Sequence, residues 1–174
     1  MDIMEHMRHR RSVRQYTGAA IDDLLLKQVL EAGIIAPTGR NLQSVECIVI
    51  KDRHRLQELA HSRKSGAGML EKAGAAILVL ADADKTDTWL EDASIAAAYM
   101  HLTADALGLG SCWIQMRARE STDERPMEDW LRERFLFPTN LRAVSIISLG
   151  VIDSHPDPHA AHAIQWKKVH TERY

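Results

Sequence analysis

The hydrophobic pattern of the chain is dominated by residues 75–81, which read Ala-Ala-Ile-Leu-Val-Leu-Ala without a polar break. A continuous apolar run of this kind is typical of a central strand whose two faces are both buried. Three other strand-like runs, at residues 45–50, 111–115 and 143–149, are rich in β-forming residues. We therefore predict four strands, with residues 75–81 at the centre of the sheet.

Apolar residues at three- and four-residue spacing predict the helices. The strongest pattern covers residues 89–107, and Gly108 is placed to end that helix. Shorter helices are predicted at residues 2–9, from Asp22 to between residues 33 and 36, at 53–61, and at 123–134 on the outer surface. The apolar stripe of the long helix consists of Ile95, Ala98, Tyr99, Leu102 and Ala106.

Alanines also line the long helix, at positions 93, 96, 97 and 104. Small side chains let a neighbouring helix approach closely, and apolar residues occur on more than one side. This pattern indicates burial in a core or in a subunit interface.

The order of these elements predicts a single α+β domain over residues 1–174, with a mixed, mainly antiparallel central sheet flanked by helices. The length of 174 residues is that of one domain with a substantial core. No internal repeat, low-complexity tract or linker divides the chain.

Charge and cysteine content exclude several classes of protein. A net charge of −2 argues against nucleic acid as the main partner, because nucleic-acid-binding domains are usually basic. No run approaches the roughly 18 apolar residues of a membrane span, and the N-terminus lacks a secretory apolar region. Cys47 and Cys112 lie in apolar contexts and form no C-x-x-C pair, so they are predicted to be reduced core residues. We expect a cytoplasmic protein without membrane or nucleic-acid partners.

A local cationic cluster, Arg10-Arg11-Ser12-Val13-Arg14, stands out from this near-neutral balance. In an extended segment, Arg10, Ser12 and Arg14 share one face, while Arg11 and Val13 point to the other. Guanidinium groups and a hydroxyl suit a phosphate, which needs several charge-assisted donors. A solvated basic run is the alternative interpretation.

The polar loop of residues 37–43 follows the second predicted helix. Gly39 permits a close backbone approach or a positive φ. The amides of Asn41 and Gln43 each carry a donor and an acceptor, which suits the edge of a pyrimidine-like ring. Ordinary turn chemistry is the alternative. A second loop, residues 64–68, is glycine-rich and could border a ligand pocket, but it lacks the pattern of a phosphate-binding loop.

The glycines of Gly108-Leu109-Gly110 do not form a dinucleotide-binding fingerprint. The third glycine of that fingerprint would fall at Trp113, and the order here is helix, glycines, strand.

The tail from Val151 onward is weakly periodic, so only packing against something else, such as a second subunit, would order it. It carries His155, His159 and His162. Two prolines break their spacing, and no acidic or cysteine ligand completes a set, so no metal site is predicted.

Taken together, three segments resemble the FMN-dependent nitroreductase family. They are residues 10–16 (Arg-Arg-Ser-Val-Arg-Gln-Tyr), residues 36–43 (Ala-Pro-Thr-Gly-Arg-Asn-Leu-Gln), and residues 92–114, which end in Leu-Gly-Leu-Gly-Ser-Cys-Trp-Ile. Each motif is weak alone, but the three occur in the order of the family. A weaker echo follows at Lys168-Val169-His170.

The resemblance implies a nitroreductase-like homodimer with FMN at the subunit interface and a C-terminal extension packing on the partner subunit. It assigns the FMN phosphate and ribityl chain to Arg10, Arg11, Ser12 and Arg14. It also brings the backbone of Gly108, Leu109 and Gly110 near the flavin and lets Lys167 or Lys168 reach the phosphate. The loop of the other subunit would meet the isoalloxazine ring through Pro37, Thr38, Gly39, Asn41 and Gln43.

The chain departs from the family pattern in three respects. Ser44-Val45 stands where many members have Pro-Trp, and His162 or nothing stands where many carry a basic tail residue. The long insertions that often form a lid are missing, so we expect an open pocket. Gln115, Arg117 and Arg119 are candidate substrate contacts.

The implied activity is electron transfer from NADH or NADPH to a nitroaromatic, quinone or similar acceptor. The flavin N5 carries the chemistry and no side chain is catalytic, so both substrates use one site in a ping-pong mechanism. Three alternatives remain. One is other flavin chemistry, namely dehalogenation, flavin fragmentation or azoline oxidation. The others are a non-enzymatic flavin-binding protein and a basic-patch binding module without a cofactor.

Overall fold

Two strands, β2 (Ala75–Asp82) and β4 (Leu141–Gly150), lie side by side at the centre of a four-stranded sheet. The computed structural model describes residues 2–174. β1 (Val45–Ile50) and β3 (Gly110–Gln115) complete the strand order β1-β2-β4-β3, and all three pairings are antiparallel. The four predicted strands and the α+β class are confirmed, and β2 is central as its sequence predicted.

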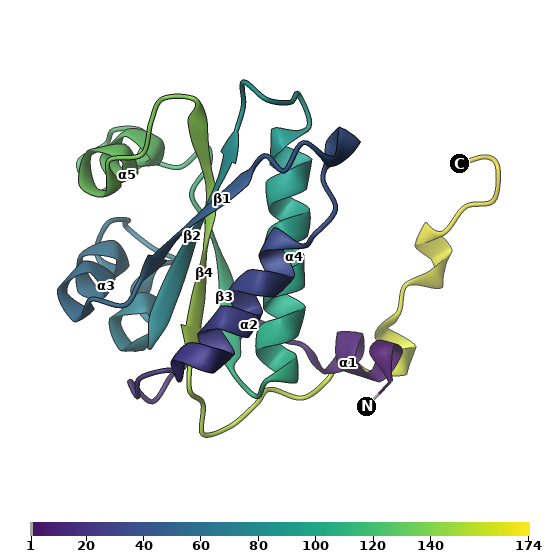
Figure 1. Cartoon of the computed structure of the whole chain (residues 1–174). Helices are drawn as coiled ribbons and strands as arrows, with labels where there is room; N and C mark the ends of the chain where they lie inside the picture. The colour runs from purple at the N-terminus through teal and green to yellow at the C-terminus, as the bar shows by residue number, and fades with distance from the viewer. Residues whose placement is uncertain (1) are drawn as a thin grey trace.

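Each face of β2 contributes to a separate hydrophobic core. Ala76, Leu78 and Leu80 belong to one core, and Ile77 and Val79 to the other. The whole strand is buried because helices cover both faces of the sheet, as Figure 1 shows. The unbroken apolar run of β2 follows from this double burial.

On one face, α4 (Trp89–Ala106) packs against the sheet, and α2 (Asp23–Ile34) packs beside it. The helices come close at Gly33, where an added Cβ would lie 2.0 Å from Met100 Cε. The side of α4 that faces the core consists of small residues and one methionine, all fully buried: Ala93, Ala96, Ala97, Met100 and Ala104.

The predicted apolar stripe of α4 does not face the core. Ile95 is exposed, and Tyr99 is 41% exposed. The alanines occupy the core side because the backbone of α4 lies close to the sheet, so the larger residues point outward. The sequence left open a core or a subunit interface; the alanine side of α4 is buried in the core, and the stripe of larger residues is exposed in the single chain.

On the other face lie α3 (Arg53–Ala60) and α5 (Met127–Phe135). α5 begins later than predicted, because Pro126 caps it and residues 121–125 form a turn in which the Arg125 Nε donates to Asp123 Oδ2 at 2.8 Å. It is also less superficial than predicted, since Met127, Trp130 and Leu131 are buried.

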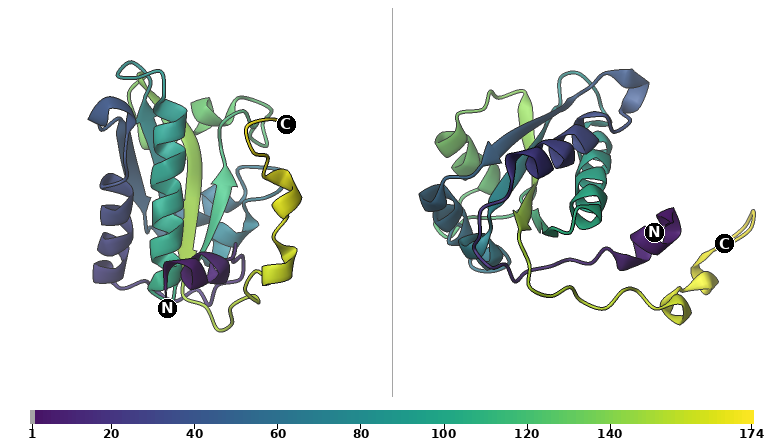
Figure 2. Two further views of the ribbon diagram at one scale, coloured as in Figure 1. Left: turned by 90° about the vertical axis from the view of Figure 1, so that its right-hand side faces the viewer. Right: turned by 60° about the horizontal axis from the view of Figure 1, so that its bottom comes forward.

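The two ends of the chain leave this body together. α1 (Ile3–His9) contacts the end of α4, where His6 Nε2 lies 2.8 Å from Leu102 O, and the tail from residue 151 runs past α1 away from the sheet, as the right view of Figure 2 shows. The tail carries only two short 3-10 turns, η3 (Ala161–Ala163) and η4 (Trp166–Lys168). Trp166 is 70% exposed there. Two further 3-10 turns, η1 (Gly39–Asn41) and η2 (Gly68–Lys72), lie in the body. Among the described residues, no helix is long and apolar enough to cross a membrane.

Candidate functional site

Residues 10–14, here called the arginine segment, follow an extended path along the sheet edge formed by β3. The Val13 N–H donates to Ser111 O at 2.9 Å, and the Thr17 N–H donates to Val151 O at 3.0 Å. Burial raises the pKa of Tyr16, so its hydroxyl keeps its proton and donates to Val13 O at 2.8 Å. The predicted facing of its side chains assumes an extended backbone, and these bonds agree with that condition.

Two glycines of the sheet let the segment lie this close. An added Cβ at Gly110 would lie 2.4 Å from Ile152 Cγ2 and 3.0 Å from Val13 Cγ1. An added Cβ at Gly150 would lie 2.4 Å from the Tyr16 ring. Because any side chain at these positions would push the segment outward, the glycines fix its position.

The groups that influence the pKa of a neighbouring thiol, Cys112, indicate which side chains of the segment lie on one face. Burial raises the pKa of the Cys112 thiol on β3, and Arg14, a hydrogen bond with Ser12, and Arg10 oppose this shift. These three side chains therefore lie near the same buried thiol, while Val13 is buried in the core. Arg11 points elsewhere, because its Nη1 donates to Asp157 O in the tail.

The cations of the arginine segment have no acidic partners. Within residues 2–174, no ion pair involves Arg10, Arg11 or Arg14. Arginines elsewhere in the fold do pair with carboxylates, namely Arg40, Arg125, Arg132, Arg134 and Arg142. The neighbouring His101 is neutral near pH 7: its Nδ1 lies 2.7 Å from Ser111 Oγ, and burial, followed by the charge of Arg10, lowers its pKa to about 4. The segment thus presents positive charge that is available to an anion.

A cavity of about 450 Å³ adjoins the end of the arginine segment. Arg14, Tyr16 and Gly68 are among its lining residues. Of the loop of residues 64–68, which the sequence marked as a possible border of a ligand pocket, Gly68 lines this cavity.

The loop of residues 37–43, here called the amide loop, is held by a buried carboxylate in the first turn of α4. The Gly39 N–H donates to Asp92 Oδ1 at 2.9 Å, and the Ser44 hydroxyl donates to Asp92 Oδ2 at 2.7 Å. Asp92 is 2% exposed. The loop also bonds to itself, because the Gln43 N–H donates to Thr38 Oγ1 at 3.0 Å.

The backbone of the amide loop is unusual at three residues that are not glycine. Arg40, Asn41 and Gln43 have φ values of 54°, 55° and 49°. Gly39 does not have a positive φ. Its role is the close approach, since an added Cβ would lie 2.4 Å from Thr88 Oγ1. Strained backbone of this kind persists only where the surrounding structure holds it, and here Asp92 anchors the loop at Gly39 and Ser44, on either side of the three residues.

The arginine segment and the amide loop lie at opposite ends of α4. The loop is bonded to Asp92 in the first turn, whereas Asp105 in the last turn bonds to His9, the residue before the arginine segment. The helical rise between these two positions is about 20 Å. Figure 1 shows η1 beside one end of α4 and α1 beside the other. One chain therefore does not bring the two segments together.

Of the remaining predicted site residues, some lie beside the arginine segment and others lie away from it. Gly108 ends α4 with a φ of 75°, and Gly110 packs against Val13, so this glycine pair lies beside the arginine segment. Lys167 and Lys168 lie in η4 of the tail, which stands apart from the body in Figure 1. Gln115 ends β3 at the strand terminus opposite Gly110. Arg117 Cζ lies 5.8 Å from the centre of the Trp89 ring, away from the arginine segment. Arg119 follows two residues later in the same loop.

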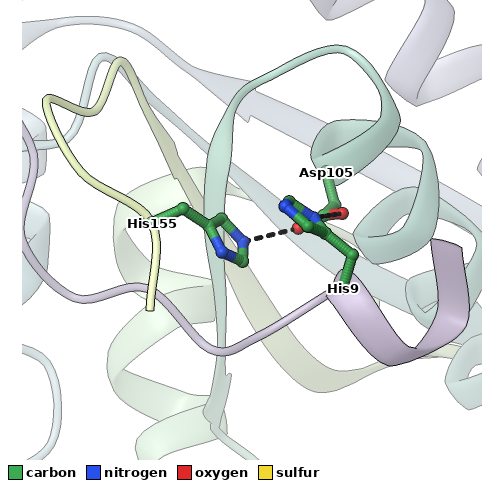
Figure 3. Close-up of side chains that lie close together, drawn as sticks. All are labelled: His9, Asp105 and His155. Atoms are coloured by element: carbon green, nitrogen blue, oxygen red, sulfur yellow. Dashed lines mark hydrogen bonds and ion pairs between the residues drawn. The ribbon is translucent and has the colours of Figure 1, made fainter. Parts of the chain in front are cut away.

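One cluster was missed by reasoning from the sequence. The expectation that no acidic group meets the tail histidines is wrong for His155, whose Nε2 lies 2.8 Å from Asp105 Oδ1. His9 Nδ1 lies 2.8 Å from the other oxygen of Asp105 (Figure 3). The three residues come from the tail, α4 and α1, so no local spacing could have revealed them.

Comparison with known proteins assigns this arrangement to one family. The sequence model of the nitroreductase family matches residues 7–67 and 56–151. A protein of Archaeoglobus fulgidus, named as a candidate NADH dehydrogenase/NAD(P)H nitroreductase, is 34% identical over 156 residues, covering 87% of this chain and 86% of the relative.

Solved structures agree. The FMN-dependent nitroreductase of Clostridium difficile R20291 superposes with a TM-score of 0.95 at 36% identity, covering 99% of this chain and 100% of the other. A candidate nitroreductase of Desulfovibrio desulfuricans in complex with FMN gives a TM-score of 0.80 at 26% identity, covering 100% and 98% of the two chains.

Proposed function

This chain belongs to the nitroreductase family, and we propose that it is an FMN-dependent oxidoreductase. It takes electrons from NADH or NADPH and passes them to a nitroaromatic, quinone or similar acceptor by a ping-pong mechanism. The family supports this assignment, as do the names of relatives such as the FMN-dependent nitroreductase of Clostridium difficile.

The observation that carries the proposal is the set of unpaired cations on the arginine segment. The available side chains fit the phosphate of FMN, because Arg10 and Arg14 supply charge-assisted donors and Ser12 lies between them with a hydroxyl. Gly110 and Gly150 keep this face close to the sheet. Arg11 Nη1 donates to Asp157 O in the tail, so this arginine joins the tail to the segment, and its other donors can still contribute to phosphate binding.

FMN, when bound, supplies the redox chemistry by accepting a hydride from the nicotinamide and then reducing the acceptor. The protein contributes binding and orientation. Arg10, Ser12 and Arg14 hold the anionic end of the cofactor, and the amides of Asn41 and Gln43 present donors and acceptors to the ring edge. No side chain needs to act as a nucleophile, in keeping with the absence of a predicted catalytic residue.

We further propose a homodimer in which the amide loop of one subunit completes the site of the other. Within one chain the loop and the arginine segment lie too far apart to share one cofactor. The outward stripe of α4, with Ile95 and Tyr99, offers an apolar surface for a second subunit. The exposed Trp166 and Val169 fit a tail that packs on the partner, which would also bring Lys167 or Lys168 to a phosphate.

The visible absorption spectrum of the purified protein after incubation with FMN, before and after anaerobic addition of NADH or NADPH, tests the cofactor and the reductant. We expect a flavin spectrum that bleaches with one of the two. A flavin spectrum that neither reductant changes would support a non-enzymatic flavin-binding protein. The absence of bound flavin would overturn the proposal.

Steady-state kinetics at several fixed concentrations of the reductant test the shared site. Parallel double-reciprocal lines are expected, and intersecting lines would count against the ping-pong mechanism.

A mixed dimer tests the shared cofactor site. One parent carries Arg10→Ala and Arg14→Ala, and the other carries Asn41→Ala and Gln43→Ala. Each parent alone is expected to bind FMN poorly, whereas the mixed dimer regains one intact site, formed by the arginine segment of the second parent and the amide loop of the first. A mixed dimer that binds no better than its parents would show that the site is built within one chain.

A further inference from the structure

A cluster of histidines surrounds the buried carboxylate of Asp105, outside the proposed cofactor site. Asp105 Oδ2 lies 2.8 Å from His9 Nδ1, and Asp105 Oδ1 lies 2.8 Å from His155 Nε2. A third histidine, His6, is one helical turn before His9 on α1, and its Nδ1 lies 3.8 Å from Asp105 Oδ2. Figure 3 shows His9 and His155 pointing at the same carboxylate from two different segments.

The ligand atoms lie at distances that a metal ion could bridge. One potential ligand atom each from His9, Asp105 and His155 lies within 4.8 Å of the others. In a tetrahedral site with bonds of about 2.0–2.1 Å, the ligand atoms are about 3.3 Å apart. Both histidine nitrogens are already 2.8 Å from the carboxylate, which is close to this spacing. The His9 and His155 rings stack with their centroids 4.0 Å apart and their planes at 21°, so metal binding requires one ring to rotate until both nitrogen lone pairs point at the ion.

The charge around Asp105 also favours a cation. Its side chain is 3% exposed, and in the described part of the chain its ion-pair partners are histidines alone: His6, His9 and His155. A buried carboxylate is costly unless a positive charge compensates it. A cavity of about 580 Å³, lined in part by His6, His9 and Asp105, gives an ion access from solvent.

We propose that His9, Asp105 and His155 bind a divalent transition-metal ion such as Zn²⁺, with His6 as the fourth ligand. Imidazole nitrogens with one carboxylate suit zinc, and four protein ligands give a closed, structural site. The ion joins α1, the last turn of α4 and the start of the tail. Because His9 directly precedes Arg10, it also fixes the start of the arginine segment.

Metal binding to the tag-free, full-length protein tests this proposal without reference to its activity. The protein is first treated with a chelator, and Zn²⁺ is then titrated in competition with a chromogenic chelator. We expect one Zn²⁺ per chain, and an X-ray absorption spectrum with a first shell of nitrogen and oxygen at about 2.0–2.1 Å. Mg²⁺ in excess should not compete, because it prefers oxygen ligands.

Variants identify the ligands. Asp105→Asn and His155→Ala should each weaken Zn²⁺ binding by about 100-fold or more, since even residues that only support a ligand contribute 10- to 100-fold. His54→Ala and His162→Ala, which remove exposed histidines outside the cluster, should leave the affinity unchanged. His155→Ala is the safer variant for folding, because His155 lies in the tail, and circular dichroism of the metal-free form checks it.

Two results would overturn the proposal. The first is a wild-type protein that takes up less than one Zn²⁺ per chain at micromolar concentration. The second is a Zn²⁺ affinity that the control substitutions lower as much as His155→Ala does, which would indicate non-specific binding to surface histidines.

Discussion

The arginine segment and the amide loop are built in opposite ways. The arginine segment has an ordinary extended backbone, and its chemistry lies in charged side chains that lack acidic partners. The amide loop has three left-handed residues, and a single buried carboxylate, Asp92, holds it in place. Substitutions that remove charge should therefore affect the first segment, and substitutions that alter backbone support should affect the second.

The largest expected effect is on cofactor affinity. Replacing Arg10 and Arg14 together by alanine removes two charge-assisted contacts, each worth about 1.5–3 kcal/mol, so FMN affinity should fall by at least about 100-fold. Quenching of FMN fluorescence on titration with the protein measures this. Arg125→Ala, which removes an arginine already paired with Asp123, is the control and should bind normally. Unchanged FMN affinity in the double variant would mean that the arginine segment is a solvated basic run that does not bind the phosphate.

Removing the carboxylate that supports the amide loop should mainly affect stability. Asp92→Ala leaves the Gly39 N–H and the Ser44 hydroxyl without their partner, at a cost of about 3 kcal/mol in the free energy of unfolding. Urea denaturation measures the loss. Asp87→Ala removes an exposed carboxylate that faces Arg40 at 3.5 Å and should cost close to nothing. Equal losses in the two variants would mean that Asp92 does not support the loop.

Acid should lower the free energy of unfolding through His101, which lies near Arg10. The pKa of His101 is about 4 in the folded protein, below the ordinary value near 6.5, so the unfolded chain takes up a proton first as the pH falls. Stability present above pH 6.5 is therefore lost on approaching pH 4. From pH 7 to pH 5 the loss is about 2 kcal/mol.

Urea denaturation at both pH values, for the wild type and His101→Gln, checks this effect of His101. The variant should lose less stability on acidification. An identical loss in the two proteins would assign the pH dependence to other groups.

A single methyl group should displace the arginine segment. In Gly110→Ala the new Cβ meets Ile152 and Val13, and overpacking of this kind costs about 1–3 kcal/mol. Thermal unfolding measures the loss, and FMN affinity should fall with it because the segment moves. Gly68→Ala is the control for stability, since no atom lies within 4 Å of its added Cβ. A Gly110→Ala protein as stable as this control would contradict the close packing described above.

The smallest expected effect is a gain in stability in the amide loop. Arg40→Gly and Arg40→Ala both remove the exposed pair with Asp87, but only glycine relieves the positive φ of 54°. The glycine variant should therefore be more stable than the alanine variant by up to about 1 kcal/mol. Thermal unfolding of the two variants measures this difference. A more stable alanine variant would show that the loop is not strained at Arg40.

The sequence was sufficient where structure follows from local pattern. The unbroken apolar run of β2 is a property of neighbouring residues, and the buried central strand that it predicts is confirmed. The alternation of the arginine segment, which assumed an extended backbone, agrees with the burial of Val13 and with the bond from Arg11 to the tail. It was insufficient for α4, because hydrophobicity alone does not tell which of two apolar sides faces a core. Ile95 and Tyr99 point outward only because the alanines let the backbone approach the sheet.

Contacts between distant segments were beyond the reach of the sequence. Asp92 meets Gly39, and Asp105 meets His9 and His155, across separations that only the fold closes. The polar residues of a helix that is otherwise rich in alanine gave no indication of these partners. The same limit applies to the proposed contact between subunits, which the resemblance to the family suggested and which the local sequence pattern could not indicate.

The strand order has a consequence for how the protein is made. β4 is the last strand in the sequence, yet it pairs with β2 from Ala75–Leu149 to Asp82–Leu141 in the middle of the sheet. At about 5–20 residues per second, a ribosome takes roughly 4 to 15 seconds to synthesise the residues from Ala75 to Leu149. Throughout that interval the most apolar strand of the nascent chain has an open edge, which is the form of strand most prone to aggregation. Production of this protein at high levels should therefore depend on chaperones that shield the nascent chain until β4 has been synthesised.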